Sequence, residues 1–533
     1  MSSLSSSPSW DEHENVSSIA KHAQDRNMFT RLWNLSKRRY MRVAVGVAAF
    51  LFLAALTLQR FSLQSQLRER FQHQKPLAGS ESDSTRCEDA HSGNEKHCDD
   101  TLNLPSDYDH APEEPPFCAS RFGRKYLDDF RDSATGYCSQ GSASSLTCFH
   151  TNTSPVSPKL DSFCFARHAS FNITGNKVRI DCKLKDSNNN DNERTKHAPP
   201  LENFPGYWYE TGPRFIFENY IDIEQQSEET KEATSSQKLN NIILLKREGA
   251  FNTWHSMIEI FSMTLSMDIL QMTKDPTSNA PFFTVDDIED THVLILDEHD
   301  DGPYFDLWTL FAKKPILKLS NISPTALLEN FNVIIPLPGG SNPTWQGDWK
   351  VNPCTRGELL RTFSQRVLDF YNITKPTRTD DNKRVKVTFI DRTESRRLTD
   401  STAYLAAVSA AFPYVDVQSI DFAAIPFKEQ VSIIRNTDVL VGVHGGGLTH
   451  GMFLPAGSAM VEILPAQLDH KGFHNLAKLL GHTYFRTHAR KPRARRDAWH
   501  GQDVFLDKER FVELVGAAVR SMYNKGSRNY DIN

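Results

Sequence analysis

The feature that most constrains this chain is a strand-like apolar run that leads into three consecutive glycines. Residues 439–443 (Val-Leu-Val-Gly-Val) follow Asp438 and carry no polar side chain, which is typical of a parallel strand covered on both faces. Gly445, Gly446 and Gly447 come one residue later. Because glycine has no Cβ, the backbone there can adopt a positive φ and approach another group closely. The pattern predicts a strand, a tight turn and a helix start in succession.

The same turn predicts a site for an anion. A helix that opens near Leu448 leaves its first N–H groups without intrahelical partners, beside a backbone that a ligand can approach. The run lacks the G-x-G-x-x-G spacing of dinucleotide-binding folds, and no Gly-Lys-Ser/Thr follows it as in a P-loop. Two interpretations stay open here, namely phosphate binding and a turn whose glycines serve packing alone.

His444 and the three glycines also match the oxyanion-hole signature that precedes the nucleophile of esterases. That hypothesis requires a Gly-x-Ser-x-Gly motif downstream, where the serine would be the nucleophile. The nearest candidate, residues 456–460 (Ala-Gly-Ser-Ala-Met), lacks the second glycine and comes only a few residues later. The pattern therefore disfavours an esterase.

Length and charge narrow the class of protein. The 533 residues, 39% hydrophobic and 24% charged, suffice for two or three globular domains with additional segments. A net charge of −5 and a pI near 6.4 give no overall basic field, so nucleic acid is not expected as a partner. The basic cluster at 490–496 is interpreted as a solvated loop, with contact to a phosphate or a glycan as the alternative.

Residues 43–58 are an apolar run without a charged side chain, and basic residues precede it between 37 and 42. As a helix this run rises about 24 Å, which is short for a bilayer, but flanking arginines can snorkel and early secretory membranes are thin. The denser positive charge before the run predicts a cytosolic N-terminus and a lumenal remainder. The prediction is a single-pass type II anchor in the ER or Golgi, with a buried soluble helix as the alternative.

The cysteines support the same topology, because all of them lie beyond the predicted anchor. An even number confined to one side predicts disulfides in an oxidising lumen, although the sequence does not give the pairing. No C-x2-C pair occurs, so structural zinc is not expected. Glycosylation sequons are present at Asn152, Asn172 and Asn372. The eight cysteines are Cys87, Cys98, Cys118, Cys138, Cys148, Cys164, Cys182 and Cys354.

Changes in composition and hydrophobic pattern along the chain predict six segments. They are a disordered cytosolic tail (1–42), the anchor (43–58), a lumenal stem (59–116), a cysteine-bearing N-terminal elaboration (117–239) and two Rossmann-like domains (240–378 and 379–533). Strand-like and helix-like stretches alternate in the last two segments, which predicts an α/β fold with parallel sheets and two domains that face one another. A nucleotide would lie in the groove between them.

Four patches, in chain order, carry a resemblance to a known family. They are residues 252–259, residues 294–308 (Leu-Ile-Leu-Asp, then Gly-Pro and Trp), residues 389–397 (Phe-Ile-Asp-Arg to Arg-Arg) and residues 441–463, which include the glycine turn. Together they resemble glycosyltransferase family 61, which includes enzymes that transfer N-acetylglucosamine to EGF domains and plant xylosyltransferases. The chain differs from the family pattern at Ser256, Glu259, Gly446 and His450, which leaves the acceptor open.

The resemblance implies an inverting enzyme with a GT-B arrangement. An acceptor hydroxyl would attack the anomeric carbon in a single displacement while UDP departs. The implied enzyme moves a sugar from a UDP-sugar to a protein or glycan hydroxyl in the secretory lumen, with N-acetylglucosamine favoured over xylose. The first Rossmann-like domain would hold the acceptor and the second the nucleotide sugar. A catalytically silent carbohydrate-binding protein would share the fold and the anchor.

The donor site is predicted around the glycine turn. Backbone N–H groups and arginine forks can neutralise a diphosphate without a metal, and a strand-end carboxylate can accept hydrogen bonds from ribose. No cofactor is required by motif, although Mn²⁺ or Mg²⁺ remains open. The predicted donor-binding residues are His444, Gly445, Gly446, Gly447, Leu448, Thr449, Arg392, Arg397 and Glu462.

The predicted catalytic residues are Glu259 and His255, which lie four positions apart and share one face of a helix. Glu259 is favoured as the base that takes the acceptor proton, and a purely structural His255 is the alternative. The acidic run 297–302 (Asp-Glu-His-Asp-Asp-Gly) invites a calcium loop, but the twelfth position falls on Trp308 rather than a glutamate. The run is interpreted as a turn, and no metal site is predicted.

Overall fold

The computed structural model describes most of the chain beyond residue 113. The described residues are 105–108, 114–152, 159–172, 176–185, 198–224, 239–276, 278–322, 330–374, 384–490, 501 and 503–523. The predicted tail and the anchor at 43–58 lie outside these ranges. Within them, no helix combines the length and the apolar character that a membrane crossing requires. The chain divides into Met1–His97 and Cys98–Asn533, and the described residues all belong to the second unit.

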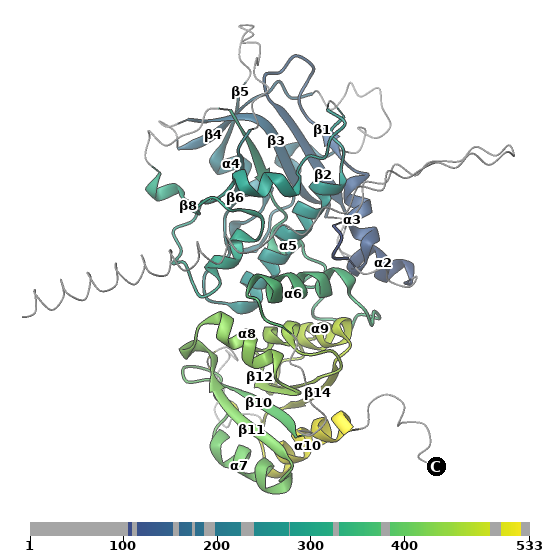
Figure 1. Cartoon of the computed structure of the whole chain (residues 1–533), viewed down its shortest axis with the longest axis vertical. Helices are drawn as coiled ribbons and strands as arrows, with labels where there is room; N and C mark the ends of the chain where they lie inside the picture. Colours follow the sequence, from purple (N-terminus) through teal and green to yellow (C-terminus); the bar gives the residue numbers. More distant parts are fainter. Residues whose placement is uncertain are drawn as a thin grey trace, which may run out of the picture. The chain divides into compact units, whose positions relative to one another are not determined.

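The C-terminal part forms a five-stranded parallel sheet in the order β11-β10-β12-β13-β14 (Figure 1). Numbered along the chain this order is 2-1-3-4-5, so the connections change direction between β10 and β12, and ligands bind at the carboxyl ends of such a switch point. The fully buried strand predicted at 439–443 is confirmed as β12. The strands are β10 (Val385–Asp391), β11 (Val415–Asp421), β12 (Val439–Val443), β13 (Ala459–Leu464) and β14 (Thr483–His488).

Helices cover both faces of this sheet. Alternate residues of its strands point to opposite sides, so each strand contributes side chains to a core on either face. Val439 and Val441 of β12 pack with the helices α7 (Ser401–Ala411) and α10 (Lys508–Tyr523). Leu440, between them, belongs to the core on the other face. That second core includes buried residues of α8 (Phe427–Arg435), α9 (Gly472–Leu480) and the 3-10 helix η10 (Gly446–Phe453).

The N-terminal part forms a nine-stranded mixed sheet, whose main path is β1-β2-β3-β9-β6-β7-β8. β9, β6, β7 and β8 are parallel, whereas β1, β2 and β3 from the cysteine-bearing stretch extend the sheet antiparallel. The predicted α/β class with parallel sheets is confirmed, and the antiparallel extension is an addition. The strands are β1 (Thr135–Gly136), β2 (Ser145–Thr151), β3 (Asp161–Asn172), β4 (Lys177–Asp181), β5 (Ile221–Glu224), β6 (Asn241–Leu245), β7 (Thr291–Ile295), β8 (Leu317–Lys318) and β9 (Phe331–Ile335).

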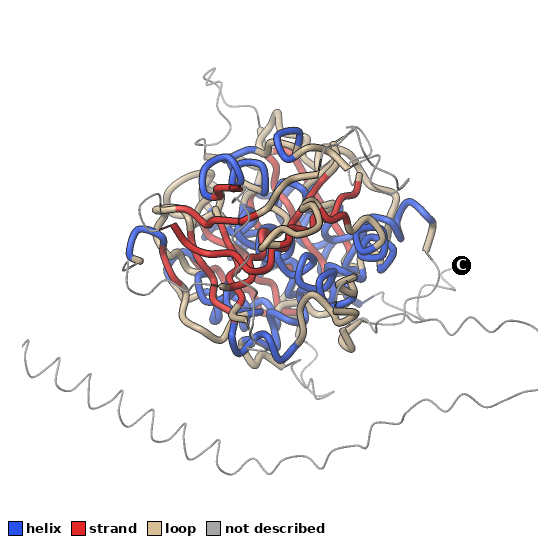
Figure 2. The backbone as a smooth tube through the Cα atoms, turned by 90° about the horizontal axis from the view of Figure 1, so that it is seen from above, coloured by secondary structure: helices blue, strands red, loops and turns tan. Residues whose placement is uncertain are grey.

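The parallel part of this sheet also contains a switch point. Along the chain its order β8-β7-β6-β9 is 3-2-1-4, so the direction of connection changes between β6 and β9. The residues that follow these two strands therefore meet at one edge of the sheet. Viewed from above, strands lie in the interior with helices around them (Figure 2).

The helix α5 (Thr253–Met272) lies at the centre of the core. Every residue of α5 except His255 and Gln271 is buried, and a helix that is enclosed on all sides belongs to a core rather than a surface. Phe261 of α5 stacks on Phe363 of α6, with ring centroids 4.9 Å apart. The other α-helices of this part are α2 (Pro116–Phe122), α3 (Arg124–Arg131), α4 (Pro213–Tyr220) and α6 (Glu358–Phe370).

Three disulfides join the described cysteines, as the even count predicted. Cys148–Cys164 links residues that face each other across β2 and β3. Cys138–Cys182 closes the same region. Cys118–Cys354 connects α2 to the segment that precedes α6, across 236 residues of sequence. Cys87 and Cys98 lie outside the described residues.

A buried ion pair fixes α6 to α5. The Nη1 atom of Arg366 lies 2.9 Å from Asp268 Oδ2, and the aspartate side chain is fully buried. Tyr108 donates a hydrogen bond of 2.5 Å to the same carboxylate, and Asp107 binds the outer edge of the guanidinium. Tyr108, at the end of the short segment 105–108, is therefore part of the folded core.

We expect Arg366→Ala to lower the free energy of unfolding by about 3–5 kcal/mol, because the change leaves the Asp268 carboxylate buried without its counter-charge. Arg214→Ala is the matched control: its pair with Glu218 is exposed and contributes at most about 1 kcal/mol. Urea unfolding monitored by circular dichroism measures both. Equal losses in the two variants would contradict the role assigned to the pair.

Candidate functional site

The glycine turn and the end of β10 meet at the switch point of the C-terminal sheet. Gly445 has a φ of +152°, which favours glycine. A Cβ on Gly445 would lie 2.9 Å from the Nη1 atom of Arg392 and 3.2 Å from the Cζ atom of Arg396. The predicted convergence of Arg392 with the glycine turn is therefore observed, and the missing side chain makes room for the arginines.

The backbone N–H groups of the turn are only partly used within the protein. The N–H of Leu448 donates to the carbonyl of Gly445 at 3.0 Å, and the Leu448 side chain is buried in the core. Thr449 is also fully buried, and its hydroxyl has no hydrogen-bond partner within the described ranges. The N–H groups of Gly446 and Gly447 occupy the first two positions of η10, where helix geometry provides no intrahelical acceptor.

Two arginines converge beside Gly445. Arg392 donates from Nε to the carbonyl of Ser395 at 2.7 Å, and Arg396 donates from Nη1 to the carbonyl of His444 at 2.9 Å. Burial lowers the pKa of both guanidinium groups, and the charge of Arg392 lowers that of Arg396 further, to about 10. Two like charges in a partly buried position repel each other, so an anion bound between them would be stabilised.

Arg397 does not join this cluster. Its side chain is exposed and forms a bidentate pair with Asp503, with the closest atoms 2.6 Å apart. Arg396 occupies the place beside the turn instead. Arg396 has a φ of +54°, and such a local bend in a loop is not encoded in the periodicity of the sequence. The sequence pattern therefore predicted an arginine-rich segment beside the turn, but it did not predict which of these arginines faces the turn.

The predicted residues His444 and Glu462 contact each other directly. The distance from His444 Nδ1 to Glu462 Oε1 is 2.5 Å, and Tyr484 donates to the other carboxylate oxygen. Burial lowers the pKa of His444. Glu462 is only 1% exposed, so this carboxylate supports His444 from within the sheet rather than standing at an open strand end.

A second histidine lies beside His444. The ring centroids of His444 and His470 are 5.1 Å apart, and His470 Nε2 lies 2.9 Å from Asp348 Oδ2. Trp349, which is 61% exposed, packs edge-on against His470. Asp348 and His470 lie more than a hundred residues apart in the chain, so their proximity was not visible in the sequence.

The N-terminus of α5 reaches the glycine turn. A Cβ on Gly446 would lie 3.1 Å from Asn252 Oδ1, the atom that caps α5 by accepting from the Trp254 N–H. Trp254 packs edge-on against Phe473 of α9, with centroids 5.4 Å apart. Since His255 follows Trp254, the predicted catalytic helix and the predicted donor turn are brought together.

His255 is held by a carboxylate that the sequence did not indicate. Its Nδ1 atom lies 2.7 Å from Glu248 Oε2, in the loop that follows β6. The imidazole ring packs against Trp345 and against Tyr209, with ring centroids 4.6 Å and 5.1 Å away and both pairs T-shaped. The His255 side chain remains 17% exposed. This histidine is therefore oriented and accessible.

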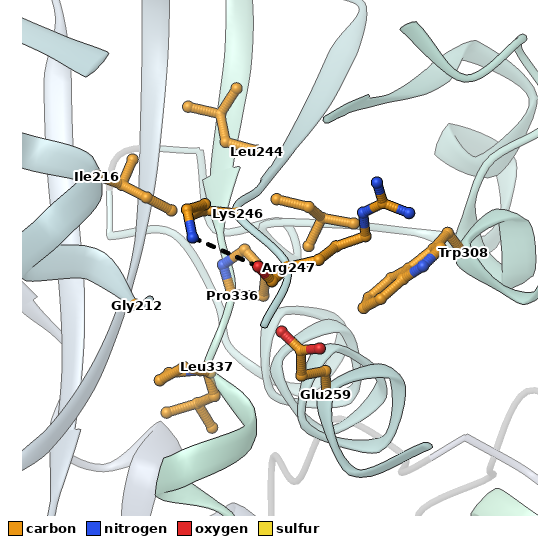
Figure 3. A pocket seen from close by; sticks show the side chains of 11 residues that line it. Gly212, Ile216, Leu244, Lys246, Arg247, Glu259, Trp308, Pro336 and Leu337 are labelled. Carbon is orange, nitrogen blue, oxygen red and sulfur yellow. Dashed lines mark hydrogen bonds between the residues drawn. The ribbon is translucent and has the colours of Figure 1, made fainter. Parts of the chain in front are cut away.

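Glu259 lies deeper than His255. Its Oε1 atom accepts from the Glu248 N–H at 2.9 Å, and its Oε2 atom has no hydrogen-bond partner in the described part of the chain. Burial raises the pKa of Glu259 well above its usual value, and the charge of Glu248 raises it further. Glu259 lines a cavity of about 20 Å³ together with Arg247 and Trp308 (Figure 3). A cavity of this size holds about one water molecule.

The acidic run at 297–302 is an irregular loop that begins with a bend at Asp297. Asp297 forms a buried pair with Arg247, with the closest atoms 2.8 Å apart. Arg247 also donates to the carbonyls of His299 and Asp300. Across the described ranges, no group of three or more His, Cys, Asp or Glu side chains is placed to hold a metal ion.

Part of this chain is similar to known proteins. Residues 254–461 match the family model described as glycosyltransferase 61. EGF domain-specific O-linked N-acetylglucosamine transferases are similar: that of Drosophila melanogaster is 29% identical over 245 residues (45% of this chain, 44% of that protein) and that of Mus musculus 26% over 245 residues (45% and 43%). The alignments thus span less than half of these relatives. They confirm the resemblance to family 61 and support a glycosyltransferase.

A solved structure of a glycosyl transferase of family 9 from Veillonella parvula DSM 2008 also overlaps the chain. It covers 53% of this chain and 97% of that chain, at 7% identity and a TM-score of 0.24.

We expect wild-type protein to lose stability relative to Glu259→Gln as the pH rises above about 4.5. Because burial raises the folded-state pKa of Glu259, the folded protein keeps a proton that the unfolded chain releases above its ordinary value of 4.5. The free energy of unfolding then falls with pH by up to about 1.4 kcal/mol per unit, a slope that glutamine removes. Urea unfolding of both proteins between about pH 4 and 8 measures the difference. Parallel pH profiles would contradict a protonated Glu259.

Proposed function

We propose that this chain is an inverting glycosyltransferase that moves a sugar from a UDP-sugar to a protein or glycan hydroxyl, with N-acetylglucosamine favoured as the sugar. The observation that carries the proposal is the convergence of Arg392 and Arg396 on Gly445, at the switch point of a parallel sheet. A nucleoside diphosphate is the ligand that this position and this charge suit.

The diphosphate would lie between the two guanidinium groups and the N–H groups of Gly446 and Gly447. These donors are fixed by the fold before the substrate arrives, so they can stabilise the charge that develops as UDP departs. Arginine suits this task because its planar fork can bind two phosphate oxygens together. No metal is required, and UDP is the expected leaving group. His444, whose Nδ1 atom is held by Glu462, would position the sugar by accepting a hydrogen bond at Nε2.

The GT-B arrangement is proposed because of how the two sheets are built and connected. Two sheets each contain a parallel part with a switch point, and α5 carries residues from the first switch point to the glycine turn of the second. The sugar would then lie near the N-terminus of α5. The first sheet and its loops would hold the acceptor, and the second the nucleotide.

The acceptor side offers exposed aromatic surface. Tyr209 is 50% exposed and contacts His255, and Trp349 is 61% exposed and contacts His470. Exposed aromatic residues beside a cleft are suited to recognition, since they bury much apolar area with few rotatable bonds. The names of the relatives specify EGF domains as acceptor and N-acetylglucosamine as sugar. An EGF domain hydroxyl is therefore the first acceptor to test, and xylose is the alternative sugar.

The proposed location is the lumen of the ER or Golgi, with residues 43–58 as a type II anchor. The disulfides favour an oxidising compartment on the side of the folded part. The proposed partners are a nucleotide sugar, an acceptor and the membrane.

The function is tested by incubating the purified chain with a panel of nucleotide sugars and a folded EGF domain. Mass spectrometry of the EGF domain detects transfer, and UDP release detects turnover. We expect transfer from UDP-N-acetylglucosamine, unaffected by EDTA. UDP binding without turnover of any donor would instead favour the silent carbohydrate-binding protein.

We expect Arg396→Ala to weaken UDP binding by about 10- to 100-fold, because a charge-assisted hydrogen bond contributes about 1.5–3 kcal/mol. Arg397→Ala, one residue away and paired with Asp503 outside the turn, is expected to change the affinity less than about 3-fold. Isothermal titration calorimetry with UDP measures both dissociation constants. If the two variants bind UDP equally well, the donor site does not lie at the glycine turn.

A further inference from the structure

Three ionisable side chains meet at the switch point of the N-terminal sheet. Glu248 lies in the loop after β6, whereas His255 and Glu259 are one turn apart on α5. The His255 side chain is 17% exposed and that of Glu248 only 1%, while Glu259 is buried. Only the imidazole can therefore meet a substrate without a rearrangement of the core.

We propose that Glu248 is the carboxylate that orients His255, that His255 takes the proton from the acceptor hydroxyl, and that Glu259 is a neutral acid beneath them. The identity of the substrate in this assignment rests on the proposed function. The distribution of charge among the three side chains does not.

The contact between Glu248 and His255 fixes the tautomer of the imidazole. An ionised carboxylate can only accept a hydrogen bond, so the Nδ1 atom, 2.7 Å from Glu248 Oε2, carries the proton. The lone pair then resides on Nε2, which is the atom available to a substrate. Trp345 and Tyr209 both pack against the ring, at interplanar angles of 84° and 87°. Geometry and tautomer are thus set before a substrate binds.

The side chains of Glu248 and Glu259 lie close together. A Cβ on Gly339 would lie 2.8 Å from Glu259 Cγ and 2.9 Å from Glu248 Oε1, so the two side chains approach the same point next to Gly339. A like charge nearby in a buried position favours the protonated form of a carboxyl group. Burial and then the charge of Glu248 raise the pKa of Glu259.

The surroundings decide which of the two keeps the proton. Glu248 is stabilised as an anion by His255, by Lys246 and by a hydrogen bond from the backbone of Gly340. Glu259 receives one hydrogen bond, from the Glu248 N–H. Burial raises the pKa of both groups, and it raises that of the fully enclosed Glu259 further. The proton therefore resides on Glu259.

The other charged groups nearby do not change this result. Arg247 is paired with Asp297 at 2.8 Å, and these two groups have opposite effects on the pKa of Glu259. The rings of Tyr209 and His255 are nearly perpendicular, and the tyrosine brings no charge to the cluster. The cavity of about 20 Å³ beside Glu259 has room for a water molecule that can accept a hydrogen bond from the protonated carboxyl group.

The proposed step accounts for the proton, the new bond and the leaving group. The acceptor O–H bond breaks and its proton moves to Nε2 of His255, while the acceptor oxygen forms a bond to the anomeric carbon. The bond from that carbon to the diphosphate breaks, and the electron pair leaves with UDP. Glu248 stabilises the imidazolium that forms, as a carboxylate behind a catalytic histidine does in other enzymes. Glu248 is thus a positioning residue, and His255 is the base.

The test measures the pKa of His255 in the full chain by NMR of protein labelled with ¹³C at histidine Cε1, with His255→Asn to assign the signal. We expect Glu248→Gln to lower the pKa of His255 by about one unit or more, a tenfold loss of proton affinity, because it removes the adjacent negative charge. Glu259→Gln is expected to shift it by less than about 0.3 units, because a neutral acid is replaced by a neutral amide. A large shift in Glu259→Gln, or none in Glu248→Gln, overturns the proposal.

A kinetic measurement separates this proposal from the proposed function. With UDP-N-acetylglucosamine and an EGF domain, Glu248→Gln is expected to lower kcat about 10- to 100-fold with little change in the KM for the donor, and to move the acidic limb of the kcat/KM profile to lower pH. The exposed Glu218→Gln serves as the control. If NMR gives the expected shifts but no nucleotide sugar turns over, the proposed function is wrong while the charge arrangement stands. If turnover occurs and Glu248→Gln leaves kcat unchanged, Glu248 does not position the base.

Discussion

The contact between the glycine turn and the first residues of α5 holds the candidate site together. Gly446 approaches the capping side chain Asn252 so closely that a methyl group would lie 3.1 Å from its oxygen. Through this contact the carboxyl ends of the parallel strands of one sheet meet those of the other. In each sheet this is the point where the strand order reverses. Loops at such points are free of strand pairing, which is why each can present charged side chains. The arginines on one side and the carboxyl–imidazole cluster on the other follow from this arrangement.

The two halves of the site accommodate neighbouring like charges in different ways. At the glycine turn, Arg392 and Arg396 retain like charges side by side, an arrangement that favours an incoming anion. Beneath His255, burial and the charge of Glu248 raise the pKa of Glu259, which favours a retained proton there. The first half is suited to a bound anion and the second to accepting a proton, and these are the two tasks of the proposed displacement. The similarity of residues 254–461 to glycosyltransferase family 61 is consistent with such a division.

The sequence predicted those parts of the structure that depend on local periodicity. The strand Val439–Val443, the glycine turn and the helical spacing that places His255 and Glu259 on one face are all of this kind. It did not predict Glu248 as the partner of His255, because a loop residue seven positions away has no periodic relation to the helix. For the same reason it did not predict that Arg396, rather than Arg397, faces the glycine turn. The antiparallel extension of the first sheet depends on pairing between β3 and β9, more than 150 residues apart, which no local pattern records.

The disulfide between Cys118 and Cys354 has a consequence for synthesis. Its partners are separated by 236 residues, so at roughly 5–20 residues per second the first thiol waits about 12 to 50 s for the second to leave the ribosome. Cys138, Cys148, Cys164 and Cys182 emerge during that interval and offer nearer partners. Correct maturation therefore requires either that Cys118 stays reduced or that a premature bond is reshuffled, which makes thiol exchange catalysis a determinant of yield for this chain.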